Sequence, residues 1–223
     1  NDILLGGMVM EYIRPSLVKM YKNAGYDFIL ADGEHVLFSG LPAMADFVLA
    51  ARDNGLPVIC KIPELARPDV ARLLEAGAFG MQLPRTESRA QLEQLADYMK
   101  FPPVGSRAGA PLFGNVDYVW PDDDKKWIEG ANAATIVVAH IETRLGFENI
   151  EEIVTAEHLD MLYIGAYDFS ISMGHPGQYD HPEIISAMEH VQTTCLNAGI
   201  PFGTTPPNPQ TGGRWLARGA RFF

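Results

Sequence analysis

The 223-residue sequence has little cysteine and no long hydrophobic run. Its two cysteines, Cys60 and Cys195, lie in apolar surroundings and form no CxxC motif, so we expect two buried free thiols rather than disulfides or a zinc site. The apolar run near the start falls well short of the roughly 20 residues that cross a bilayer, and it lacks a basic leader and a cleavage site. The sequence therefore predicts a cytoplasmic protein that does not enter the membrane.

Basic residues are also scarce. Seventeen Lys and Arg stand against 28 Asp and Glu, which gives a formal net charge of −11. Because no Lys/Arg cluster offsets this charge locally, the chain repels phosphate backbones, and nucleic acids and anionic membranes are excluded as partners. Any anionic substrate must then be held by a few local cations or by a metal ion.

Motifs of several enzyme classes are missing. No GxGxxG opens a helix, which argues against a dinucleotide-binding sheet. Ser170 and Ser172 lie outside a GxSxG context, and neither cysteine has a base nearby in the sequence. These absences argue against a covalent hydrolase.

What the sequence does contain is a repeated order of apolar run, amphipathic stretch and glycine or proline. The apolar runs lie at 6–10, 28–32, 57–62, 80–84, 135–142, 161–166, 201–206 and 221–223, and the helical stretches at 14–24, 40–54, 67–77, 86–99, 144–156, 182–198 and 209–218. Eight parallel strands, apolar on both faces, are the number that closes a (β/α)8 TIM barrel. We therefore expect one α/β barrel domain over residues 1–223, with a doubly wound open sheet as the alternative. Residues 101–134 interrupt the order, which is typical of a functional loop or a subunit contact.

Ionisable residues follow several of the predicted strands, at the end where barrel enzymes carry their active sites. Glu142 and Asp168 are placed at the ends of the fifth and sixth strands, and two carboxylates suit Mg²⁺ or Mn²⁺. His140, two residues before Glu142, leaves a strand on the same face. The alternatives are that Glu142 pairs with Arg144 and that Asp168 caps a turn.

A second group follows the second and third strands. Lys61 is the only charge in the run VICKIP, so it needs a partner. An ion pair with Glu34 or Glu75, an electrostatic catalytic role and Schiff-base chemistry all remain open. His35 follows Asp32 closely, and the two form a candidate acid/base dyad, with a turn-capping histidine as the alternative.

The other charged residues receive structural interpretations. Arg107 lies in the irregular segment, where a salt bridge that fixes the loop is the simplest role. The remaining histidines fall in helices or loops without ligand spacing and are taken as structural: His158, His175, His181 and His190.

Longer strings carry a family resemblance. GYDFILADGEH, FPPVGSRAG, HIETRLGFENIEEI, IGAYDFSISMGHPGQYDHPE and PPNPQTGGRWLARGARFF resemble the HpcH/HpaI family of class II pyruvate aldolases, from about residue 6 to the C-terminus. The resemblance implies a barrel of the phosphoenolpyruvate/pyruvate-domain type, with the family's last helix missing after Phe223.

The resemblance also implies site residues. Glu142 and Asp168 match the ligands of a divalent metal ion, Mg²⁺ or Mn²⁺, with Co²⁺ or Zn²⁺ as further options. His35 and Asp32 match the acid/base residues, and Lys61 matches a catalytic arginine. The substrate-binding and supporting positions are Ala166, Tyr167 and Asp168 for the carboxylate of pyruvate, His140 beside substrate and metal, and Glu75 for metal-bound water.

Three departures from the family pattern matter. Lys61 replaces the arginine, His140 replaces a glutamine, and GAYDFS replaces GPxDLS. Lysine cannot form the bidentate fork of arginine, so substrate size and enolate stabilisation are affected.

The expected function is a metal-dependent aldolase that cleaves a 4-hydroxy-2-oxo acid to pyruvate and an aldehyde, or the reverse. Its partners are then a small 2-oxo acid, an aldehyde and further copies of itself, in a hexamer built as a trimer of dimers. The alternatives are a 2-oxo acid hydrolase or decarboxylase on the same metal site, and a catalytically weakened oxo-acid binding protein.

Overall fold

The computed structural model describes residues 3–36 and 40–223, which form an α/β fold with seven strands. By its internal contacts the chain divides into two compact units. The N-terminal unit comprises the described residues of 5–82 and 94–136. The C-terminal unit comprises 83–93, 137–223 and the described residues before Leu5.

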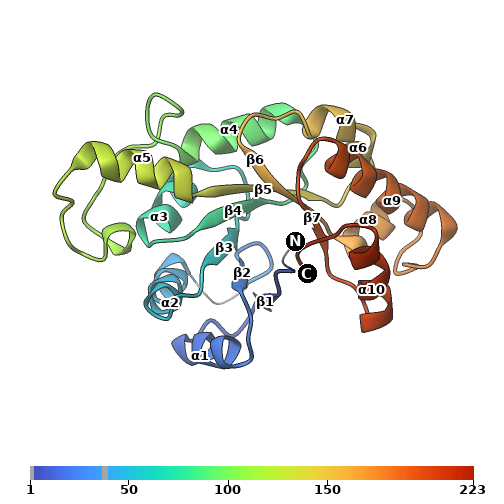
Figure 1. Ribbon diagram of the computed structural model, residues 1–223, viewed down its shortest axis with the longest axis horizontal. Coiled ribbons are helices and arrows are strands. Elements are labelled where there is room, and N and C mark those ends of the chain that lie inside the picture. The colour runs from blue at the N-terminus through green and yellow to red at the C-terminus, as the bar shows by residue number, and fades with distance from the viewer. Residues whose placement is uncertain (1–2, 37–39) are drawn as a thin grey trace. The chain divides into compact units, whose positions relative to one another are not determined.

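The N-terminal unit is built on short apolar strands that lie side by side in chain order, each parallel to the next (Figure 1). They are β1 (Gly6–Val9), β2 (Phe28–Asp32), β3 (Val58–Lys61) and β4 (Gly80–Leu83). Every residue of β3 is buried, as expected for a strand covered on both faces. The register pairs Asp32 with Lys61 and Lys61 with Gln82, so these polar side chains lie level in neighbouring strands.

The helices that return the chain in this unit are α1 (Pro15–Asn23), α2 (Leu41–Asp53) and α3 (Arg67–Glu75). Each has a proline in its first turn, where a missing N–H costs nothing. Each is followed by a glycine with positive φ, at 25, 55 and 77, which confirms the helix ends that the glycines predict. In Figure 1, α1 contacts α2, and α2 contacts α3.

The segment after α4 (Arg89–Met99) is more regular than its sequence indicates. Within the stretch predicted to be irregular lie a 3₁₀ turn, η1 (Gly114–Val116), and a helix, α5 (Asp124–Ala134). Asp123 caps α5 by accepting a hydrogen bond from the Lys126 N–H. No residue of α5 is buried, although Trp127, Ala131 and Ala134 recur at helical spacing along one of its faces.

In the C-terminal unit three strands lie parallel in chain order. They are β5 (Ile136–Ile141), β6 (Leu159–Ile164) and β7 (Phe202–Thr204). The helices are α6 (Arg144–Glu148), α7 (Ile150–Ile153), α8 (Ala166–Ser172), α9 (Pro182–Asn197) and α10 (Pro209–Ala217). The long helix α9 packs against β7 and α7 through a buried stripe that includes Ile184, Met188 and Val191.

Three sequence predictions for this unit are wrong in detail. The predicted helix 144–156 is broken at Asn149 into α6 and α7. Residues 166–172 form a helix, α8, rather than the end of a strand. The predicted eighth strand, 221–223, is too short to form one, since Phe222 makes only single parallel bridges to Leu4 and Gly203.

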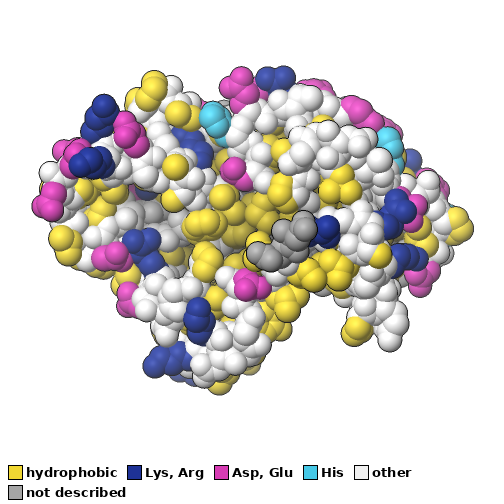
Figure 2. Space-filling view, viewed as in Figure 1, with side chains coloured by type: hydrophobic (Ala, Val, Ile, Leu, Met, Phe, Trp, Pro, Cys, Tyr) yellow, Lys and Arg dark blue, Asp and Glu magenta, His cyan; other side chains and the backbone are white. Residues whose placement is uncertain are grey.

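The structure can be compared with three features that are scarce in the sequence: long apolar runs, cysteines and basic residues. No described helix combines the length and the apolar character needed to cross a membrane. Cys60 and Cys195 are buried and free, as predicted, and burial raises the pKa of each thiol to about 12. On the face drawn in Figure 2, Lys and Arg side chains are dispersed among acidic ones rather than gathered in one patch.

Candidate functional site

Glu142 is a buried carboxylate directly after β5. Its side chain is 3% exposed. Oε1 accepts a hydrogen bond from the backbone N–H of Arg85 at 2.7 Å, and Oε2 lies 3.3 Å from His140 Nε2. The alternative partner considered from the sequence, Arg144, instead lies 3.8 Å from Glu183. A buried carboxylate held by a backbone donor and beside an imidazole offers oxygen donors of the kind that coordinate metal ions.

His140 is held rigidly beside Glu142. Its backbone N–H donates to Thr86 Oγ1 at 3.2 Å, and its carbonyl oxygen accepts from the Thr86 N–H at 3.0 Å. The imidazole is buried and meets the ring of Tyr163 edge to face, with centroids 5.0 Å apart. The prediction that His140 and Glu142 leave β5 on one face is therefore confirmed by their contact.

Gly165 makes room for these two side chains. A Cβ at this position would collide with His140 Nε2 and lie 3.2 Å from Glu142 Oε2. Only glycine therefore lets the backbone approach these two groups so closely. Carboxylate oxygen and imidazole nitrogen are donors that divalent metal ions accept, so the residues present fit a metal ion at this place.

Ala166, Tyr167 and Asp168 follow Gly165 as the first turn of α8, so the prediction that Asp168 ends a strand is wrong in that respect. The side chains of Tyr167 and Asp168 are exposed. Among the described residues, none forms a hydrogen bond or ion pair with the Asp168 carboxylate. The metal-ligand and substrate-binding roles of this turn stay predictions.

In the N-terminal unit, Lys61 ends β3 and pairs with Glu34. Nζ lies 2.5 Å from Glu34 Oε2, and the lysine side chain is 4% exposed against 22% for the glutamate. Of the two ion-pair partners considered from the sequence, Glu34 is thus the one that contacts Lys61. Pairing explains how a strand buried on both faces carries a charge.

Asp32 organises the turn that follows β2 rather than the ring of His35. Its Oδ1 accepts hydrogen bonds from the backbone N–H groups of Glu34 at 2.7 Å and His35 at 2.9 Å. The half-exposed His35 ring lies with Nε2 3.4 Å from Glu34 Oε2. In the described part of the chain, nothing donates to the buried Asp32 Oδ2. Asp32 therefore contacts the backbone N–H of His35 and not its imidazole ring. The acid/base role of the two residues stays a prediction.

Glu75 lies in the last turn of α3. Since α3 runs back from the end of β3 to the start of β4, Glu75 is at the opposite end of this unit from Lys61. Its charge acts on Arg107, whose pKa it raises against the larger effect of burial. The role of Glu75 toward metal-bound water stays a prediction.

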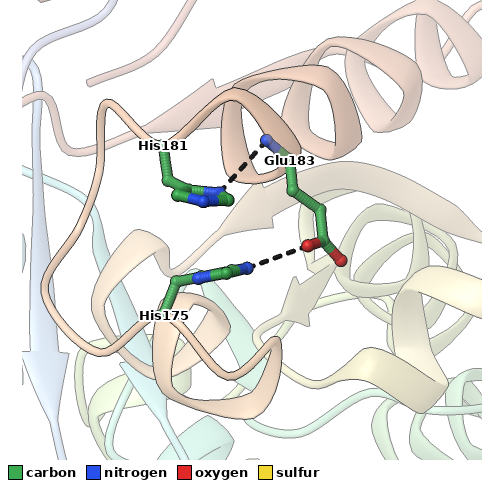
Figure 3. Close-up of side chains that lie close together, drawn as sticks. All are labelled: His175, His181 and Glu183. Atoms are coloured by element: carbon green, nitrogen blue, oxygen red, sulfur yellow. Dashed lines mark hydrogen bonds and ion pairs between the residues drawn. The ribbon is translucent and has the colours of Figure 1, made fainter.

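One group of three potential ligands lies within 4.8 Å among the described residues, and sequence spacing did not suggest it: His175, His181 and Glu183 (Figure 3). The two rings stack with centroids 3.6 Å apart, and His175 Nε2 lies 2.8 Å from Glu183 Oε2. His181 Nδ1 accepts from the Glu183 N–H and so caps α9. The hydrogen bond from His175 is the main cause that lowers the pKa of Glu183. These groups already fix the start of a helix.

Two residues at the site escape sequence reasoning. Arg85 contributes a backbone amide to Glu142, which no side-chain pattern reveals. It does so from a left-handed conformation with a φ of 47°, which is rare outside glycine. Thr86 holds the backbone of His140 through its hydroxyl, and this threonine lies in an ordinary turn sequence.

Comparisons with known proteins agree with one another. The family model described as HpcH/HpaI aldolase/citrate lyase matches residues 7–223. The 5-keto-4-deoxy-D-glucarate aldolase of Shigella dysenteriae serotype 1 (strain Sd197) is 26% identical over 205 residues, which cover 89% of this chain and 76% of that protein.

Two solved structures are similar over nearly the whole chain. The HpcH/HpaI aldolase of Desulfitobacterium hafniense DCB-2 superposes with a TM-score of 0.92 at 27% identity, covering 99% of this chain and 85% of its own. The citrate synthase SbnG superposes with a TM-score of 0.88 at 26% identity, covering 100% and 85%. One of these similar proteins is named an aldolase and the other a citrate synthase, and both names refer to reactions that make or break a carbon–carbon bond.

Proposed function

Because the chain belongs to the HpcH/HpaI aldolase/citrate lyase family, we propose that it is a metal-dependent carbon–carbon lyase on a (β/α)8 barrel of one domain. Its reaction is the cleavage of a 4-hydroxy-2-oxo acid to pyruvate and an aldehyde, or the reverse condensation. The aldolase names of relatives at about 26% identity support this reaction class.

The observation that carries the proposal is the environment of Glu142. A carboxylate that is 3% exposed is costly unless it has a charged or hydrogen-bonding partner. Arg85 supplies one backbone donor to Oε1, and His140 and Gly165 lie close to Oε2. The carboxylate oxygens of Glu142, beside the imidazole of His140, are donors of the kind that coordinate a divalent cation.

In this proposal Glu142 and Asp168 hold the metal ion, with Mg²⁺ or Mn²⁺ favoured by oxygen donors. When bound, such an ion stabilises negative charge on the oxygens of a 2-oxo acid. The backbone N–H groups of Tyr167 and Asp168, in the first turn of α8, have no acceptor within the helix and bind the pyruvate carboxylate. His140 orients Glu142 and bound water.

The remaining roles in this proposal fall to His35, Asp32 and Lys61. His35 accepts the proton of the C4 hydroxyl while the C3–C4 bond breaks, so that the bond electrons pass to the pyruvate enolate. The enolate then takes up a proton to give pyruvate. Asp32 fixes the turn that carries His35 through two backbone hydrogen bonds. Lys61 adds a positive charge that stabilises the enolate oxygen.

A second candidate is a weakened enzyme that binds oxo acids. The observation that favours it is the pairing of Lys61 with Glu34, because a lysine already engaged by a carboxylate has less charge to offer than an unpaired arginine. A hydrolase or decarboxylase on the same metal site would differ from both in its products.

The experiment is a screen of 4-hydroxy-2-oxo acids with chelator-treated protein, with and without added Mn²⁺ or Mg²⁺. The proposal expects equal amounts of pyruvate and aldehyde in the metal-loaded samples. Carbon dioxide or an inorganic anion as the co-product would contradict it in favour of a decarboxylase or hydrolase. Binding of oxo acids without turnover would favour the binding protein.

The family resemblance also supports a homo-oligomer, proposed as a trimer of dimers in the cytoplasm. Light scattering at micromolar concentration tests the assembly, and a monomer would contradict it.

A further inference from the structure

The N-terminal unit contains a second polar centre, away from Lys61. A cavity of about 480 Å³ is bordered by α2, α3 and α5 and by the chain entering β3 and β4. Val58, at its edge, begins β3, whereas Lys61 ends that strand about 10 Å away at 3.3 Å per residue. Cavities of this size hold small organic molecules.

The charge of the lining is opposite to that of the chain. Arg52, Arg107 and Lys126 border the cavity, and no Asp or Glu does. In a protein with a formal charge of −11, three cations around one cavity without an acid among them indicate a preference for an anion.

Arg107 is the residue that makes this preference specific. Its side chain is 6% exposed, and its guanidinium lies 4.5 Å above the ring of Phe101. In the described part of the chain no carboxylate lies within 4 Å of it, and its side-chain N–H groups donate no hydrogen bond. The salt bridge expected from the sequence is therefore absent among these residues. Burial lowers the pKa of Arg107 to about 10, and Glu75 offsets only part of this effect.

The other two cations that border the cavity are paired with carboxylates. Arg52 forms a bidentate pair with Asp117, and Lys126 lies 3.3 Å from Asp123. Arg107 thus remains the one cation on the cavity wall without a described carboxylate, so the site offers one unit of positive charge. A buried guanidinium without an acceptor is unfavourable until an anion joins it.

The rest of the wall fits an apolar body. The Trp127 ring packs at a tilt of 55° against Phe101, with centroids 5.0 Å apart. It borders the cavity together with Val48, Leu56 and Leu74. Asn115 donates through Nδ2 to Ala110, while no described group donates to its buried Oδ1. An acceptor oxygen of this kind suits a ligand with a hydroxyl or amine besides its acid group.

We propose that this cavity is a second binding site, for a small organic monoanion whose carboxylate contacts Arg107 and whose apolar or aromatic body lies against Trp127. The site is separate from the residues proposed for catalysis, and it stands independently of the aldolase proposal. A monoanion matches the single unpaired guanidinium, and the apolar wall disfavours a strongly hydrated dianion.

Isothermal titration with benzoate, benzamide and inorganic phosphate tests the site. Benzoate is expected to bind the wild-type chain at least about tenfold more tightly than uncharged benzamide, the scale of one charge-assisted hydrogen bond. Arg107→Met should lose that tenfold preference. Gly130→Phe should abolish benzoate binding with Arg107 intact, because Gly130 borders the cavity and a Cβ there meets no atom within 4 Å.

Arg72→Met, a change at a surface arginine outside the cavity, is the matched control and should bind benzoate as the wild type does. Should Arg107→Met fail to fold by circular dichroism, Gly130→Phe still decides. Benzoate that does not bind at millimolar concentration, binds both variants like the wild type, or binds no better than benzamide would overturn the proposal. Phosphate bound more tightly than benzoate would overturn the assignment to an apolar monoanion.

Discussion

Lys61 and Glu34 form an ion pair at the end of β3, with Nζ 2.5 Å from Oε2 and most of the burial on the lysine side. Removing one partner therefore affects the other to a different extent. Without Glu34, Lys61 is a buried cation that has lost the one ion pair it forms among the described residues. Without Lys61, Glu34 still reaches solvent and the ring of His35.

This inequality predicts the order of two stability changes. Glu34→Gln should destabilise the fold by about 3 kcal/mol, the scale for breaking a buried pair by removing one partner. Lys61→Met should cost less, because it leaves a partly solvated carboxylate and an apolar replacement. Urea unfolding of both variants measures the difference, and the reverse order would show that the lysine reaches water.

Lys61 is expected to act by its charge rather than by a covalent bond. Lys61→Ala should reduce turnover by about 10²-fold, as for the loss of one preorganised charge, whereas Lys61→Arg should keep most of the activity. Borohydride treatment in the presence of pyruvate, followed by mass spectrometry, should leave Lys61 unmodified. A trapped pyruvate adduct on this residue would instead support a Schiff base.

His35 is expected to transfer the hydroxyl proton of the substrate. His35→Ala should reduce aldol cleavage by about 10²–10⁴-fold, the range for a general acid/base residue. Asp32→Asn should be milder than Asp32→Ala, because an amide oxygen can still accept from the N–H groups of Glu34 and His35. Steady-state cleavage assays on the three variants suffice. Wild-type turnover in His35→Ala would disprove the assignment.

Gly165 is expected to matter because His140 and Glu142 pack closely against its backbone. Gly165→Ala should displace His140 or Glu142 and weaken Mn²⁺ binding, since the added Cβ collides with His140 Nε2. Gly213→Ala, in the same unit and with open space around its Cβ, is the control and should leave binding unchanged. Titration with Mn²⁺, followed by electron paramagnetic resonance, measures the Mn²⁺ affinity of both variants. Equal affinities would mean that the metal does not bind near Oε2 of Glu142.

The sequence predicts most strands and helices because apolar periodicity and the glycines after α1, α2 and α3 mark them. It fails at α5, which buries no residue completely, and at α8, which follows β6 after a single glycine. The Asp- and Lys-rich stretch around the start of α5, and the apolar residues that continue from β6 into α8, hide where these two helices begin.

At the site, the sequence predicts which ionisable side chains lie near the strand ends, but it does not predict which groups contact them. Lys61 needs an anion, but only the fold selects Glu34 over Glu75. The amide of Arg85 at Glu142 and the close approach of His140 to Gly165 depend on the backbone, which residue types do not encode directly.

The most direct test of the account is pyruvate release as a function of added Mn²⁺, in chelator-treated wild type and in Glu142→Gln. Glutamine keeps the shape of the side chain and the acceptor for the Arg85 N–H but removes the charge that the metal ion needs. The account predicts that Mn²⁺ restores pyruvate release in the wild type with saturation near one ion per chain, and that the variant stays inactive over the same range. Full pyruvate release from the metal-free wild type, or equal restoration of both proteins, would contradict it.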